Sequence, residues 1–160
     1  MMTKTSIAID GYLIQKRAFK NNSLIVTFLT SDGQLLNAIM YQGQKKSLIL
    51  FCHYYLDVYI RDGLSLINKL EPYGKTKQLA EQALFCGLYV NELIGLLGKG
   101  LFDSSQVYIA YQNVITKLSS CQINEFENHL RLFEFIFLKH LGYELDFKAD
   151  QNGLSIDQEQ

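Results

Sequence analysis

The sequence predicts an α+β protein: an N-terminal five-stranded antiparallel barrel followed by an α-helical domain. Apolar residues alternate with a period of two up to residue 71, and from residue 76 onward they recur every three to four positions. The change of period coincides with Pro72, the only proline, and with Gly74. We therefore expect one domain over 1–73, a second over 74–147, and a polar, disordered tail over 148–160.

The first half contains five runs that are rich in β-branched and aromatic residues. These predicted strands cover residues 6–15, 23–30, 34–42, 53–61 and 64–71. Asp32-Gly33 and Asp62-Gly63 separate neighbouring runs and favour tight hairpin turns, because both residue types tolerate positive φ. Five short strands with a longer link between the third and the fourth fit a small barrel of the OB type.

The second half contains three helical patterns, over 76–97, 104–118 and 125–141. Asp103 with Gln106, and Asn124 with Glu127, have the spacing of capping boxes at the starts of the second and third helices. Gly142 is suited to end the third helix. Because this last helix is apolar on most of its sides, we expect it in the middle of the protein, covered by the other helices and by the barrel.

Composition and motifs argue against an enzyme and against a membrane protein. The chain is 48% hydrophobic and 19% charged, as in ordinary globular proteins, with neither a secretion signal nor a long uninterrupted apolar run, so a cytoplasmic location is expected. Cys52, Cys86 and Cys121 are too widely spaced for a metal site and are expected to be reduced thiols. The stretch GLLGKG, residues 95–100, lacks the residues of a phosphate-binding loop, so we interpret it as a turn between helices. We therefore expect no cofactor, no metal and no catalysis.

Charge is divided unevenly along the chain. Residues 1–78 hold ten Lys and Arg against five Asp and Glu, whereas residues 79–160 hold five against eleven. A basic half is one indication of contact with nucleic acid, although small domains also differ by several charges without such a role.

Two basic segments, KRAFK at 16–20 and QGQKKS at 42–47, fall in predicted loops. On an OB barrel such loops border the groove that holds a nucleic-acid strand. The side chains expected to neutralise phosphates are Lys16, Arg17, Lys20, Lys45 and Lys46, and those expected to stack on bases are Phe19, Tyr41, Tyr55 and Tyr59. The alternative is that these lysines are solvated and these tyrosines half-buried, as in most proteins.

Three segments resemble the RecO family of bacterial recombination mediators. They are GYLIQKRAFKNNSLIVTFLTSDGQL at 11–35, ALFCGLYVNELIGLL at 83–97 and LRLFEFIFLKHLGYELDF at 130–147. The resemblance implies a non-enzymatic DNA-repair factor with an N-terminal OB barrel and a helical domain. It also implies binding to single- and double-stranded DNA, strand annealing, cooperation with RecR, and loading of RecA.

The resemblance further implies binding of the acidic, Phe-ended tail of single-stranded-DNA-binding protein. Arg131 matches the family position whose guanidinium meets that tail beside an apolar pocket, and its fork of donors suits a carboxylate. A local alternative is open, because Glu127 and Glu134 have the spacing to hold Arg131 in surface ion pairs.

The chain also departs from the family pattern. Ala18 replaces a proline, and only Lys45 and Lys46 stand where relatives carry a longer basic stretch, so weaker DNA binding is expected. No cysteine follows the last motif, so no zinc module is expected. The resemblance implies further helices packed on the 130–141 helix, and residues 148–160 do not have their pattern, so we expect apolar helix surface that a partner can cover. A protein-interaction or self-associating module with little DNA affinity is therefore the alternative function.

Overall fold

The computed structural model describes residues 6–75, 78–100 and 105–143, and the predicted tail at 148–160 lies outside them. Five strands come first: β1 Ser6–Phe19, β2 Ser23–Thr30, β3 Leu35–Met40, β4 His53–Arg61 and β5 Leu64–Pro72. Three helices follow: α1 Glu81–Leu97, α2 Ser105–Leu118 and α3 Phe126–His140. The short 3-10 turns are η1 Gly43–Lys45, η2 Gly98–Gly100 and η3 Ile123–Glu125.

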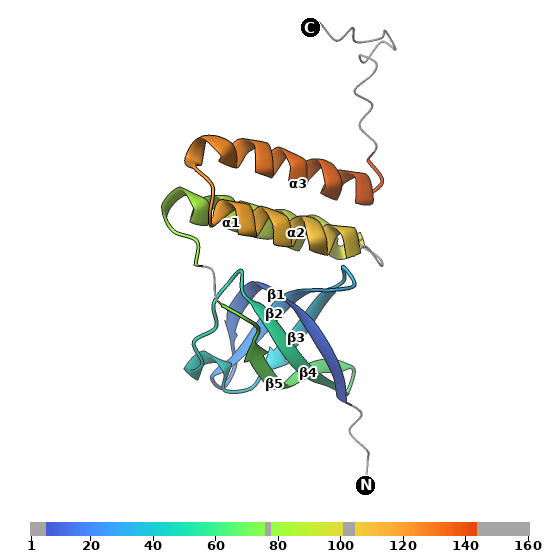
Figure 1. Cartoon of the computed structure of the whole chain (residues 1–160). Coiled ribbons are helices and arrows are strands. Elements are labelled where there is room, and N and C mark those ends of the chain that lie inside the picture. The colour runs from blue at the N-terminus through green and yellow to red at the C-terminus, as the bar shows by residue number, and fades with distance from the viewer. Residues whose placement is uncertain (1–5, 76–77, 101–104, 144–160) are drawn as a thin grey trace, which may run out of the picture.

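The strands close into a barrel in the order β1-β2-β3-β5-β4 (Figure 1). Neighbouring strands are antiparallel except β3 and β5, which pair in parallel through Ile39 and Leu66. Five strands in this arrangement form an OB-type barrel, so the predicted fold class is confirmed, with one parallel contact that the sequence pattern did not reveal.

β1 pairs with two strands and thereby closes the barrel. Its first part pairs with β4 and its second part with β2, with a bulge between Leu13 and Gln15. Gly11 lies where the two parts meet, and a Cβ there would be 2.6 Å from the carbonyl oxygen of Leu29. The strand can bend across β2 at this point because residue 11 has no side chain.

The hairpin between β1 and β2 differs from the sequence prediction. Residues 16–19 continue β1 as strand, and only Lys20, Asn21 and Asn22 form the turn. The Ser23 N–H donates to the Lys20 carbonyl oxygen at 3.1 Å, and Asn21 and Asn22 both have positive φ. Two asparagines tolerate the backbone of this tight turn, so the strand extends further than its apolar alternation indicated.

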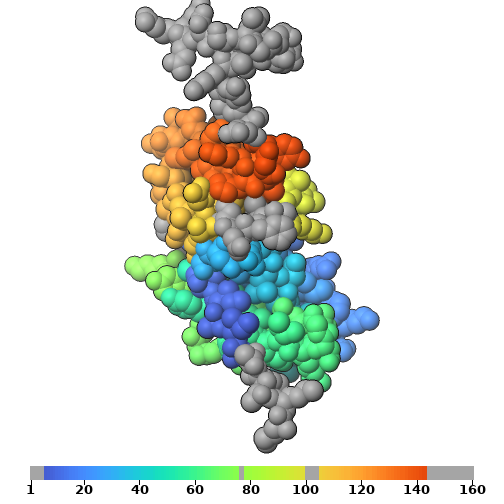
Figure 2. All heavy atoms as spheres, turned by 90° about the vertical axis from the view of Figure 1, so that its right-hand side faces the viewer, coloured from blue at the N-terminus to red at the C-terminus, as the bar shows by residue number. Residues whose placement is uncertain are grey.

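The helices stack on one end of the barrel (Figures 1 and 2). α1 and α2 lie next to the strands, and α3 lies across them on the side away from the barrel. The prediction that the third helix is central is therefore wrong: Phe133 and Phe137 are its only buried side chains, and Leu132 is 57% exposed. The barrel fills its own interior, so α3 has only one layer of helices to pack against.

Two apolar clusters hold the protein together. One fills the barrel and includes Phe28, Val26 and Leu56. The other lies among the helices and includes four residues from the barrel end, namely Tyr12, Ile14, Leu29 and Phe51.

Helix starts also differ from expectation. The first helix begins at Glu81 rather than 76, and the residues described just before it place Leu79 against α1. Gly87 gives Leu79 room, since a Cβ there would be 2.4 Å from Leu79 Cδ1. The capping box before α3 consists of Gln122 and Glu125. The predicted pair of Asn124 and Glu127 is not the box, and Asp103 lies outside the described residues.

A buried polar contact joins the two halves. Asn91 on α1 is 3% exposed, and its Nδ2 donates to the Ile14 carbonyl oxygen in the β1 bulge at 2.8 Å. The Tyr111 hydroxyl on α2 donates to Asn91 Oδ1, also at 2.8 Å. One side chain therefore fastens both inner helices to the barrel, and burial raises the pKa of Tyr111 well above its usual value.

Candidate nucleic-acid interface

A groove runs along the outer face of β1, β2 and β3, where the end of α1 approaches the barrel. Its volume is about 750 Å³. Its walls are formed by Gln15, Lys16, Arg17, Ile25, Thr27, Leu35 and Asn37 of the barrel and by Gly95 and Lys99 of the helical half. In OB barrels the face of the second and third strands is the surface that takes oligonucleotides and oligosaccharides.

Strand register explains why these side chains share the groove. Gln15 pairs with Thr27, and Thr27 pairs in turn with Asn37, so this row of side chains lies on one face of the sheet. Arg17 pairs with Ile25 in the next row of the same face. The Thr27 hydroxyl donates to Asn37 Oδ1 at 2.7 Å and fixes the side-chain amide.

The groove is basic. Arg17 and Lys99 are exposed, and neither forms an ion pair with any residue in the described ranges. No carboxylate from those ranges contributes to the groove wall. Positive charge with no neighbouring acid attracts an anionic strand.

The two predicted basic segments lie side by side at the start of β2. Gln44, in η1, donates through Nε2 to the carbonyl oxygens of Phe19 and Ser23, each at 2.9 Å, and through its N–H to that of Asn22. These bonds hold Lys45 and Lys46 beside Lys20 of the hairpin turn. The structure thus brings together cations that are more than twenty residues apart in the sequence.

Lys16 is placed differently from its neighbours. It pairs with Val26, whose side chain fills the barrel interior, and its Nζ donates to the Leu48 carbonyl oxygen in the link between β3 and β4. Its ammonium group is therefore directed toward this link, whereas Arg17 belongs to the groove face.

The four predicted stacking residues are divided between two surfaces. Phe19 pairs with Ser23 at the start of β2, and Tyr41 follows Met40, which pairs with Leu24, so both exposed rings lie beside the basic end. Tyr55 and Tyr59 lie instead on β4.

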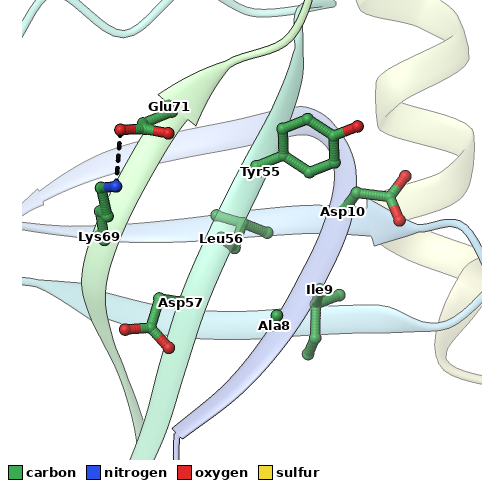
Figure 3. A pocket seen from close by; sticks show the side chains of 8 residues that line it. All are labelled: Ala8, Ile9, Asp10, Tyr55, Leu56, Asp57, Lys69 and Glu71. Atoms are coloured by element: carbon green, nitrogen blue, oxygen red, sulfur yellow. Dashed lines mark ion pairs between the residues drawn. The ribbon is translucent and has the colours of Figure 1, made fainter.

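The surface around Tyr55 carries acidic groups (Figure 3). A hollow of about 200 Å³ there is bordered by Asp10 and Asp57 and by a 2.8 Å ion pair between Lys69 and Glu71. A hydrogen bond from Asn68 at 2.7 Å holds the pKa of Asp57 below its usual value. This face is unsuited to a phosphate backbone, and the groove on β1–β3 is the better candidate.

Arg131 lies on the exposed side of α3. Its guanidinium makes both of the ion pairs that the sequence allowed, at 2.5 Å to Glu134 and 3.8 Å to Glu127. The hydrogen bond to Glu134 raises the pKa of Arg131. The Tyr89 hydroxyl donates to the other carboxylate oxygen of Glu134 at 2.7 Å, and this bond raises the pKa of Tyr89.

An apolar pocket of about 170 Å³ opens beside this network. It is lined by Tyr89, Leu93, Leu97, Glu134, Phe137 and Leu138. Glu134 therefore belongs both to the pocket wall and to the ion pair, and the cation predicted from the sequence stands next to a space for an apolar ring.

Sequence reasoning missed several groove residues. Gln15, Thr27 and Asn37 alternate with core residues along their strands, and that alternation was the available signal. Lys99 belongs to GLLGKG, whose first three residues end α1 and whose last three form the 3-10 turn η2, so the predicted turn is only half as long as expected. The place of Lys99 in the groove depends on how the helix meets the barrel.

Cys52, Cys86 and Cys121 form no disulfide, and no group of three or more potential metal ligands occurs within residues 6–75, 78–100 and 105–143. None of the helices in these ranges has the length and apolar character that a bilayer crossing requires.

The fold and the groove define a class: an OB-type barrel with a basic groove on its strand face, followed by a helical domain. The family described as "Recombination protein O C terminal" matches residues 82–157. The "DNA repair protein RecO" of Pseudoalteromonas atlantica is 30% identical over 148 residues, which cover 89% of this chain and 61% of the relative. The proteins of the same name from Glaesserella parasuis (31% identical over 143 residues) and Coxiella burnetii (29% identical over 155 residues) match 86% and 93% of this chain.

The chain belongs to the RecO family. It spans 59% to 66% of the length of these relatives.

Proposed function

We propose that this chain acts in DNA repair and recombination as a non-enzymatic mediator that binds single-stranded DNA. In this role it promotes strand annealing and, with RecR, the loading of RecA. The observation that carries the proposal is the acid-free basic groove on the strand face that OB barrels use for oligonucleotides. Membership of a family whose relatives are named as DNA repair proteins supports the same role.

The groove and the basic end suit a single strand. Arg17 and Lys99 supply charge in the groove, and Lys20, Lys45 and Lys46 extend it past the hairpin. Phe19 and Tyr41 add exposed rings for stacking at that end, and stacking of bases on aromatic rings is tolerant of sequence. Few phosphate contacts predict modest affinity with a clear dependence on salt.

Binding of labelled oligo-dT at several salt concentrations tests this role. We expect the logarithm of affinity to fall linearly with the logarithm of salt concentration, and the double variant K45E/K46E to bind more weakly with a shallower slope. The matched control is Lys117→Glu on α2, which lies outside the groove and should have a much smaller effect. Affinity that does not change with salt would contradict the electrostatic role of the groove.

We further propose that the acidic, Phe-ended tail of single-stranded-DNA-binding protein binds at Arg131. The apolar pocket lined by Leu93 and Leu97 offers space for the terminal ring, and Arg131 is the adjacent cation. In the unbound protein Glu134 forms an ion pair with the Arg131 guanidinium, so the peptide carboxylate has to compete with Glu134.

Fluorescence polarisation of a Phe-ended acidic peptide measures this competition. Arg131→Ala should reduce affinity, whereas Glu134→Gln should increase it, because the guanidinium loses the nearer of its two acidic partners. Lys139→Ala, another exposed cation of α3, is the control for general charge effects. Equal affinities for Arg131→Ala and the unaltered protein would show that the tail is held elsewhere.

A second function, protein interaction or self-association, is supported by the helix surface. Phe85 and Leu96 on α1 are 72% and 68% exposed, and Leu132 on α3 is also exposed. Apolar side chains in this number on neighbouring helices favour a partner or a second copy. Sedimentation equilibrium tests the second copy: a monomer at high micromolar concentration would exclude self-association.

A further inference from the structure

The groove is built from both halves of the protein. Gly95 lies where the end of α1 comes close to β1, and a Cβ at this position would be 2.9 Å from Gln15 Nε2. The end of α1 therefore lies against the barrel at Gln15 and brings Lys99 to the groove wall. A strand in the groove therefore meets the Arg17 guanidinium from the barrel and the Lys99 ammonium from the helical half.

The same groove contains a hydrogen-bonded polar pair, Thr27 and Asn37. Thr27 is 7% exposed, and its hydroxyl donates to Asn37 Oδ1 at 2.7 Å. This bond occupies the carbonyl side of the amide, so the exposed Asn37 side chain presents its two N–H donors outward. The groove thus offers donors from Asn37, Arg17 and Lys99 to a ligand.

We propose that the groove is a composite, base-selective site: Arg17 and Lys99 hold the phosphates of one DNA strand, and Asn37 donates to O4 of a thymine base. This rests on the proposed binding of single-stranded DNA and deepens it. Thymine presents the acceptor O4 at the position where cytosine presents the donor N4–H₂. The Asn37 N–H groups therefore favour thymine over cytosine.

The phosphate part of the proposal predicts a role for a residue of the helical half. Lys99→Gln should weaken binding of oligo-dT and reduce the salt slope by about 0.7, the value for one phosphate contact on a single strand. Lys117→Gln removes the same charge from α2 and should leave both quantities unchanged. An unchanged slope for Lys99→Gln would overturn the composite site.

The base-selective part is tested by comparing oligo-dT with oligo-dC of equal length. The unaltered protein should prefer oligo-dT by roughly two- to tenfold, the effect of one hydrogen bond. Asn37→Asp keeps the bond with Thr27 but replaces the outward donors with a carboxylate oxygen, which accepts from cytosine N4. The preference should reverse, while the added negative charge lowers both affinities together.

The outcomes separate this proposal from the broader one. If the unaltered protein binds no oligonucleotide in a salt-dependent way, the proposed function itself fails. If it binds DNA but Asn37→Asp leaves the ratio of the two affinities unchanged, base selection by Asn37 is excluded and the DNA-binding role stands. Both Lys99 and Asn37 are exposed, so neither substitution removes core packing.

Discussion

The barrel and the helices bury their apolar side chains in different ways. The barrel encloses a cluster that comes from its own strands and the link before β4, and its ring of strand pairs is closed. The helical cluster includes four side chains from the end of the barrel, and its outer helix buries only Phe133 and Phe137. From these contacts we expect the barrel to be stable by itself and the helices to depend on packing against the barrel.

The largest effect is expected from equivalent cavities in the two clusters. Phe28→Ala in the barrel and Phe133→Ala in the helices each remove a fully buried ring, which costs about 3–5 kcal/mol of unfolding free energy. Hydrogen exchange should show that Phe28→Ala lowers protection in both halves, because the helices pack on the barrel that this variant destabilises. Phe133→Ala should lower protection in α1–α3 only. Equal losses throughout the chain for both variants would show one cooperative unit instead of a self-supporting barrel.

An intermediate effect is expected at the joint between the halves. Asn91→Ala leaves the Ile14 carbonyl and the Tyr111 hydroxyl buried without their partner, and each unsatisfied group costs about 1–3 kcal/mol. Chemical denaturation should give a lower unfolding free energy and separate the transitions of barrel and helices. Asn113→Ala on the exposed side of α2 is the control, with a change expected within about 0.5 kcal/mol. A single unshifted transition for Asn91→Ala would contradict the role of this contact.

The smallest effect is expected on the acidic face of the barrel. Hydrogen bonds from Asn68 and Ser6 hold the pKa of Asp57 below the ordinary 3.8, so the folded protein binds a proton there less readily than the unfolded chain. The contribution of Asp57 to stability is therefore complete above the ordinary pKa and is lost as pH falls through the lowered value. Thermal unfolding at pH 6 and pH 3 should show a slightly smaller loss of Tm for Asp57→Asn than for the unaltered protein. A loss as large in the variant would remove Asp57 as a source of the acid dependence.

Most strands and helices, and the order of the two halves, could be predicted from the sequence. Local patterns suffice for this, since alternation of period two marks the strands, the period of the helix marks the second half, and Gly142 with positive φ ends α3 as expected. The basic segments were also visible, because charge is a property of composition. The length of β1 could not be predicted from the sequence. Asn21 and Asn22 allow a three-residue turn, as in the structure, but they are equally compatible with a longer loop.

Which side chains contact one another depends on how the barrel and the helices pack. α3 is outermost because the barrel encloses its own core, a global property that the apolar pattern of one helix does not contain. Lys99 reaches the groove because the end of α1 lies against β1, and Tyr55 is separated from the cations because β4 lies on another face. Contacts between residues far apart in the chain depend on how the barrel and the helices pack together. The periodicity of apolar residues shows only which side chains share a face of one helix or strand.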